Sequence, residues 1–165
     1  MTLVTRLKIG LQAGGLAGAG VAVLYAATDV MRLAPLETVA GLAHSFFGLS
    51  VADVPAGFDI AAFVTTGVGV TVYSLLHFAA FAALGVVGTW MVPGRSFWTT
   101  LTRGGAFGAL ACSALFYGSR LVSGSPFSFD GLDVKGIVLV NAMAGVIMAV
   151  VFAVHTHGDE EMGAE

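Results

Sequence analysis

The sequence predicts an all-α integral membrane protein with four transmembrane helices and one short amphipathic helix. Its 165 residues are 57% hydrophobic and 10% charged, whereas soluble domains carry about 25% charged residues. The apolar residues gather in four stretches that meet or nearly meet the roughly 20 residues that a helix needs to cross a bilayer, and the second is longer than a perpendicular span needs. These stretches are apolar on every side, without the alternation of barrel strands, so helices must satisfy the backbone within the lipid.

The four spans follow from where the charges and turn residues fall, and together they predict a single transmembrane domain over residues 1–165. The first, 9–28, lies between Lys8 and Asp29, and the second, 60–92, stops before Pro93-Gly94. The third and fourth are expected at 104–122 and 136–154. Arg120 lies near the end of the third span, from which its long side chain is expected to reach the headgroups.

The predicted outer loop, residues 29–59, contains the amphipathic helix at about 35–47. Pro35 is suited to open this helix and Gly48 to close it. Apolar residues recur between them at helical spacing, at Leu36, Val39, Ala40, Ala43 and Phe47. Two placements remain open: the helix lies in the membrane interface, or it packs over the mouth of the bundle or onto a partner protein.

The distribution of Lys and Arg predicts that both termini are cytoplasmic. The N-terminal flank and the loop between the second and third spans carry Arg6, Lys8, Arg95 and Arg103, against Arg32, Arg120 and Lys135 on the other side. Trp90 and Trp98, beside Arg95 and Arg103, are typical anchors at a membrane interface. We therefore expect a multi-pass protein of a bacterial inner membrane, with residues 155–165 as an acidic cytoplasmic tail.

Glycine spacing is the clearest interaction signal. Gly10, Gly14 and Gly18 form two overlapping GxxxG steps in the first span, and Gly104 with Gly108 forms one in the third. Such strips let another helix backbone approach closely. Asn141 in the fourth span is expected to hydrogen-bond between helices. The strips pack either the helices of this chain or another protein.

Short matches also hint at two parallel helical hairpins. Leu24-Tyr25 and Phe116-Tyr117 lie late in the first and third spans. Asp59 and Asp133 are candidate N-caps of the second and fourth spans, in similar local sequences. The pattern indicates either an internal duplication or chance similarity in a sequence of low complexity.

His77 is the candidate cofactor ligand, because it lies inside the second span with Tyr73 one turn before it and Phe81 one turn after. A neutral imidazole can bind haem iron or the magnesium of a bacteriochlorophyll. A second axial histidine for haem would have to be His155, at the edge of the membrane. The other interpretations are a hydrogen bond to a neighbouring helix and proton handling.

The remaining residues give no sign of catalysis. The single Cys112 excludes a disulfide framework and a thiolate zinc site, and the net charge of −3 provides no basic surface for nucleic acid. No nucleotide-binding or hydrolase motif is present, and no charge lies centrally in a predicted span. We therefore expect no enzyme, no catalytic residue, no metal site and no soluble small-molecule substrate.

The leading hypothesis is a non-catalytic accessory subunit of a larger membrane complex, such as a respiratory or photosynthetic assembly. Its expected partners are other transmembrane subunits and bound lipid, and no cofactor is required. The first alternative is a small haem- or bacteriochlorophyll-binding protein that uses His77. The second is a small oligomeric channel or transporter lined by Thr65, Thr66, Thr71, Ser74 and Asn141.

Overall fold

The computed structural model describes residues 1–33, 37–47, 60–123 and 134–162. The elements in these ranges are helices: α1 (Leu3–Met31), α2 (Glu37–Phe47), α3 (Ile60–Met91), α4 (Phe97–Phe107), the π-helical turn η2 (Gly108–Cys112), α5 (Ser113–Ser123) and α6 (Val134–Met162). Among the described residues, three helices are long and apolar enough to cross a membrane: α1, α3 over Gly67–Met91, and α6 over Val134–Thr156. The predicted all-helical membrane class is confirmed at this level.

The third predicted span, 104–122, corresponds to three consecutive elements, α4, η2 and α5. Gly108 and Ser113, where α4 and α5 join η2, both have right-handed helical backbone angles, with φ of −62° and −68°. The chain therefore stays helical from α4 to α5, and the π turn divides it into pieces that are each too short to span. This division is the reason that the stretch is not among the three candidate spans.

The helix ends differ from the predicted ones. α1 begins at Leu3 because the Thr2 hydroxyl accepts the Thr5 N–H at 3.2 Å, and it ends before Leu33, which has a φ of 58°. Asp29 thus lies within α1 and not after it. Pro35 and Gly48, the expected ends of the amphipathic helix, lie outside the described residues, although α2 itself is present.

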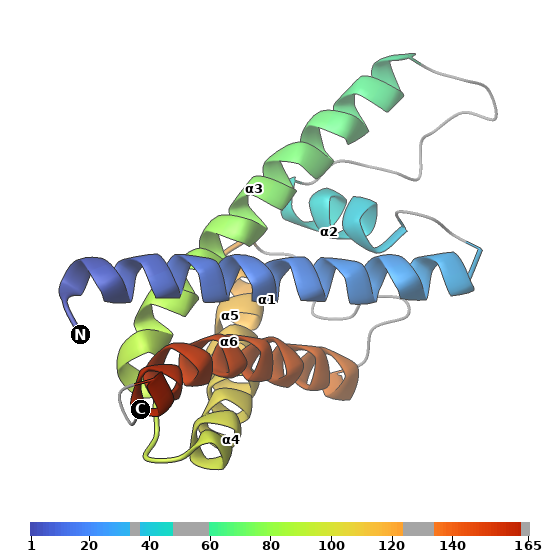
Figure 1. Ribbon diagram of the computed structural model, residues 1–165. Helices are drawn as coiled ribbons and strands as arrows, with labels where there is room; N and C mark the ends of the chain where they lie inside the picture. The colour runs from blue at the N-terminus through green and yellow to red at the C-terminus, as the bar shows by residue number, and fades with distance from the viewer. Residues whose placement is uncertain (34–36, 48–59, 124–133, 163–165) are drawn as a thin grey trace.

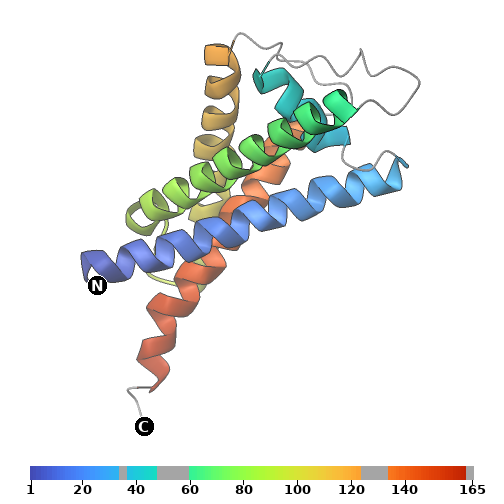
Figure 2. The same cartoon turned by 90° about the horizontal axis from the view of Figure 1, so that it is seen from above.

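α1 and α6 run in roughly opposite directions and cross obliquely, so the start of α1 and the end of α6 lie at the same side of the molecule (Figures 1 and 2). α3 crosses α1, and its first turns project away from the other helices (Figures 1 and 2). The core lies where these helices meet. It is built largely from small residues of α1 and larger ones of α6, including Ala13, Ala17, Met148 and Phe152.

Glycines form the two closest helix crossings. A Cβ atom built on Gly85 of α3 would lie 2.6 Å from the backbone nitrogen of Gly14 of α1. A Cβ on Gly145 of α6 would lie 2.7 Å from the nitrogen of Gly108. Real Cβ atoms essentially never approach so closely, so only glycine permits the backbones to touch at these points.

The two crossings share one design. A hydroxyl N-cap, Thr2 or Ser96, precedes Gly10 or Gly104 by two turns, and the side chain of each cap accepts an N–H three residues ahead. In each case a single glycine of the returning helix packs between the two glycines of the GxxxG step. The hairpins are therefore alike at the glycines. The two aspartates that suggested the likeness, Asp59 and Asp133, lie outside the described residues.

Candidate functional site

Two cavities adjoin each other around the middle of α3. Cavity 1, of about 230 Å³, lies between α1, α2 and α3. Cavity 2, of about 320 Å³, lies between the same helices and η2, α5 and α6. Four residues line both: Tyr25, Leu42, Tyr73 and His77. His77, the candidate ligand, thus lies at the junction of the two cavities.

His77 is half-buried and packed among aromatic rings. Its ring centroid lies 6.2 Å from that of Tyr73, 5.6 Å from Phe78 and 4.8 Å from Phe81. Its Nε2 atom lies 3.2 Å from the carbonyl oxygen of Gly18 in α1. A carbonyl only accepts, so Nε2 carries the hydrogen and the neutral ring keeps its free lone pair on Nδ1. The interhelical hydrogen bond that was one interpretation of His77 is present.

The structure does not bring His155 to His77. His155 is exposed on α6, and its Nδ1 lies 2.8 Å from the Val151 carbonyl. The neighbouring Phe152 ring packs at Gly88, which lies roughly 16 Å along α3 from His77. A haem held between these two histidines does not fit this arrangement, so a metal ion would have to bind Nδ1 of His77 without His155.

α2 covers cavity 1 and is held there by hydrogen bonds to the buried carboxylate of Asp29. Asp29 is 2% exposed, and its Oδ2 accepts the backbone N–H of Thr38 at 2.9 Å. Its Oδ1 accepts the Thr38 hydroxyl. A carboxylate at a helix N-terminus is stabilised by the helix dipole and the unpaired N–H groups. Asp29 thereby holds α2 so that Val39 and Leu42 line the cavity.

The expectation that Arg120 extends to the headgroups is wrong. The side chain is 3% exposed, and its guanidinium carbon lies 5.6 Å from the ring centroid of Phe116, one turn earlier. The reason is geometric, because residues four apart share a helix face and the face that carries Phe116 points into the bundle.

Sequence reasoning therefore missed a polar cluster beside the cavities. The chain has three tyrosines, on three different helices: Tyr25 and Tyr73 line both cavities, and the Tyr117 ring lies 5.2 Å from that of Phe116 on the helix that carries Arg120. The sequence did contain one signal: given the predicted spans, the tyrosines and Arg120 all fall in the half of the membrane that adjoins the predicted outer loop. That observation alone does not determine which way each side chain faces.

The predicted packing residues lie inside the molecule. Gly10, Gly14, Gly104 and Gly108 lie in the two crossings, and Gly18 faces the Phe78 ring. The side-chain amide of Asn141 donates to the Ser113 hydroxyl at 3.1 Å, which joins α6 to α5. Asn141 also lines cavity 2. The described glycines of the GxxxG steps are thus engaged with helices of this chain.

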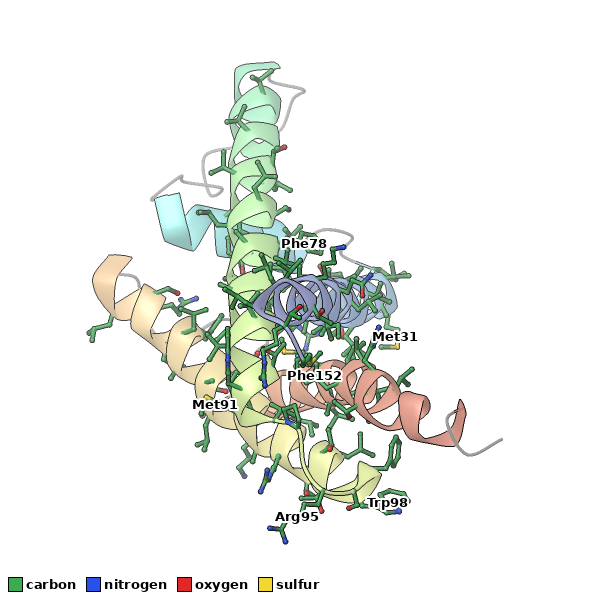
Figure 3. The ribbon with its side chains drawn as sticks, turned by 60° about the vertical axis from the view of Figure 1, so that its left-hand side comes forward. Met31, Phe78, Met91, Arg95, Trp98 and Phe152 are labelled. Carbon is green, nitrogen blue, oxygen red and sulfur yellow. The ribbon has the colours of Figure 1, made fainter. Side chains whose placement is uncertain are left out.

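The predicted anchors gather at the opposite end from the cavities. Arg95 and Trp98 lie at the end of the molecule where α3 passes into α4, and Met91 lies apart from them at the end of α3 (Figure 3). Arg6 of α1 joins them, because its guanidinium lies 5.8 Å from the Trp90 ring and donates to the Thr89 carbonyl at 2.8 Å. Arg103 donates to the Pro93 carbonyl at 3.0 Å. Trp98 is 74% exposed and packs its ring edge-to-face with Phe97.

The described members of the set proposed to line a channel, Thr71, Ser74 and Asn141, do not line one common cavity. Thr71 is exposed and donates to the Gly67 carbonyl of its own helix. Ser74 lines cavity 1, whereas Asn141 lines cavity 2. The side chains of Thr65 and Thr66 lie outside the described part of the structure.

Comparison of the chain with protein-family models, with curated proteins and with solved structures finds no match.

Proposed function

We propose that this protein is a non-catalytic membrane protein that binds a small lipid-soluble molecule in the two cavities around His77. The observation that carries the proposal is the pair of adjoining cavities that share Tyr25, Leu42, Tyr73 and His77. Ligand sites are typically concave and mostly apolar, with a few polar groups that orient the ligand. Here the apolar walls of cavity 2 come from Phe81, Leu84 and other side chains, and its polar groups are two phenols, one imidazole, the Ser119 hydroxyl and the Asn141 amide.

The ligand can be identified by purifying the protein from its own membrane in mild detergent and extracting it with organic solvent for mass spectrometry. We expect one compound in near-stoichiometric amount. Ala80→Phe fills cavity 2, which Ala80 lines. The matched control is Ala79→Phe on the exposed side of the same turn. We expect the compound to be lost from Ala80→Phe and kept by Ala79→Phe. Equal amounts in both variants would identify it as surface lipid and refute the proposal.

A pigment or a haem is one candidate for this ligand. Only Nδ1 of His77 offers a lone pair to a metal while Nε2–H is bonded to Gly18. An absorption spectrum of the purified protein tests this form directly. A visible band that persists unchanged in His77→Ala would argue against metal ligation by His77, since alanine supplies no ligand atom.

A subunit role is a second candidate, favoured by the exposure of α3. Only 11% of its apolar window, Gly67–Met91, is buried, against 39% in α1 and 44% in α6. Val64, Val68, Leu75 and Leu76 are among its exposed side chains. Helix contacts within a membrane depend on packing, so a neighbouring subunit would find a large apolar surface on α3. Native purification with mass spectrometry tests this role, and a protein that migrates without stoichiometric partners would refute it.

We further propose that α4, η2 and α5 together form a fourth span and that both termini lie in the cytoplasm. The unbroken right-handed helical angles at the π turn support the span, and the arginines at the α3–α4 end support the orientation. The amphipathic α2 would then lie at the outer face, against α3. Single cysteines placed at residues 95 and 37 in a Cys112→Ala background, labelled in intact cells with an impermeant maleimide, test both points: only residue 37 should react.

A further inference from the structure

His77 brings a hydrogen-bond acceptor to the junction of the two cavities. Its Nε2–H donates to the Gly18 carbonyl at 3.2 Å, so the lone pair of the neutral ring lies on Nδ1. No described residue forms a hydrogen bond with Nδ1, and the side chain lines both cavities. A molecule in the cavities can therefore donate a hydrogen bond to this atom.

Two other polar side chains of cavity 2 also use a donor within the protein. The Ser119 hydroxyl donates to the Phe116 carbonyl at 2.7 Å, and the Asn141 amide donates to the Ser113 hydroxyl at 3.1 Å. Ser119 and Asn141 line the cavity, and each keeps an oxygen that can accept. A ligand that offers a hydrogen-bond donor thus finds more partners here than one that only accepts.

Cavity 2 favours a neutral ligand with an aromatic head. Among the described residues, neither an acidic nor a basic side chain lines it. Aromatic rings line it beside the imidazole, from Tyr25, Tyr73, Phe81 and Phe116. Pairs of aromatic rings are stabilised beyond their apolar contact area. The volume of about 320 Å³ falls within the range of small-molecule sites, roughly 300–1,000 Å³.

The apolar remainder of cavity 2 follows one face of α3. Leu76, Ala80 and Leu84 line it, and residues four apart share a helix face. Together they extend over a rise of roughly 12 Å. Val21 of α1 and Leu115 of α5 line the same cavity. An alkyl chain lying along α3 would contact these side chains over its length.

We propose that the ligand of cavity 2 is a neutral alkylated phenol whose hydroxyl donates to Nδ1 of His77. Its alkyl tail lies along Leu76, Ala80 and Leu84. This inference rests on the proposed binding function and specifies its ligand class. A simple phenol and a hydroquinone share the required hydroxyl, and the choice of probes separates them.

The test measures binding of three probes with one dodecyl tail to the purified full-length protein by calorimetry in detergent: a phenol, its methyl ether and a hydroquinone. We expect the wild-type protein to bind the phenol about threefold to tenfold more tightly than the ether, because only the phenol donates a hydrogen bond. Tighter binding of the hydroquinone than of the phenol would identify hydroquinones as the source of the hydroxyl, and equal binding would identify simple phenols.

A pair of histidine variants provides the matched comparison. His77→Phe removes the acceptor and should abolish the preference for the phenol while leaving ether binding within about twofold. His155→Phe makes the same change at an exposed histidine outside both cavities. It should keep the preference, and loss of the preference in both variants would refute the role of His77.

A second measurement needs no change at His77 and so does not depend on the folding of that variant. The other histidines are removed by His44→Gln, His155→Gln and His157→Gln, so that nitrogen NMR of labelled histidine observes His77 alone. We expect the resonance of its unprotonated ring nitrogen to shift when the phenol is added and to stay in place with the ether. An equal shift with both probes would refute the hydrogen bond.

The outcomes separate the two proposals. Wild-type protein that binds the ether as tightly as the phenol, or a native ligand without a hydroxyl, would overturn the phenol but keep the cavity as a binding site. A visible absorption band lost in His77→Ala would indicate a metal on Nδ1 and would likewise overturn only the phenol. No binding of any probe, together with no compound extracted from the native protein, would overturn the proposed function as well.

Discussion

The α1–α3 crossing allows a sharp test because Gly14 and Gly15 are adjacent in sequence and differ completely in surroundings. A Cβ on Gly14 would lie 2.7 Å from the Cα of Ala82, whereas a Cβ on Gly15 would meet nothing within 4 Å. Carbon atoms in ordinary contact lie about 3.5–4.0 Å apart. Gly14→Ala therefore forces the two backbones apart by about 1 Å, and Gly15→Ala changes no contact.

The expected magnitudes follow from these distances. Overpacking of a well-packed core lowers the free energy of unfolding by about 1–3 kcal/mol. Replacing a helical glycine by alanine raises it by about 0.5–1 kcal/mol. Gly14→Ala should thus lower the free energy of unfolding by up to about 2 kcal/mol, while Gly15→Ala raises it by about 0.5–1 kcal/mol. Unfolding of both variants in mixed micelles of mild detergent and SDS measures the difference. A Gly14→Ala protein as stable as Gly15→Ala would refute the close crossing.

Three further predictions address the other contacts. Gly145→Ala should destabilise the α4–α6 crossing by a similar amount in the same unfolding assay, whereas Gly105→Ala, whose Cβ would meet its nearest neighbour at 3.5 Å, should not. Asn141→Leu removes the interhelical hydrogen bond and should cost about 0.6–2 kcal/mol; an unchanged unfolding midpoint would show that the bond contributes nothing. Asp29→Ala leaves the Thr38 N–H without its carboxylate and should cost about 1–3 kcal/mol locally, seen as faster hydrogen exchange in α2 with slow exchange kept in α6. If hydrogen exchange became faster throughout the chain, the contact of Asp29 with Thr38 would not act locally on α2.

Much of the fold follows from the sequence because few backbone structures can cross a bilayer. Length and hydropathy predict the long apolar helices, and the amphipathic pattern predicts a helix that α2 largely matches. The GxxxG spacing predicts close contacts, and the structure places Gly10, Gly14, Gly104 and Gly108 in them. The spacing does not reveal which helix packs against each GxxxG strip. Gly85 and Gly145 have no glycine four residues away in either direction.

The sequence alone did not show that Asp29 and Arg120 lie inside the bundle. Asp29 and Arg120 were placed at the ends of predicted spans, where charges ordinarily meet water or headgroups. Asp29 is buried because α1 continues for another turn and α2 folds back onto it. Arg120 is buried because the α5 face that carries it and Phe116 points into the bundle. Both facts depend on contacts between segments far apart in the chain.

The sequence by itself determined that this protein belongs in a membrane, since hydropathy and charge are properties of composition and local order. It also determined where close helix contacts occur, because glycine at a spacing of four residues is a local pattern. Only the tertiary structure decided that His77 donates to Gly18, that α2 covers a cavity, and that Arg120 is buried against the Phe116 ring. Those decisions depend on the rotation of each helix about its axis, and packing against the neighbouring helices sets that rotation.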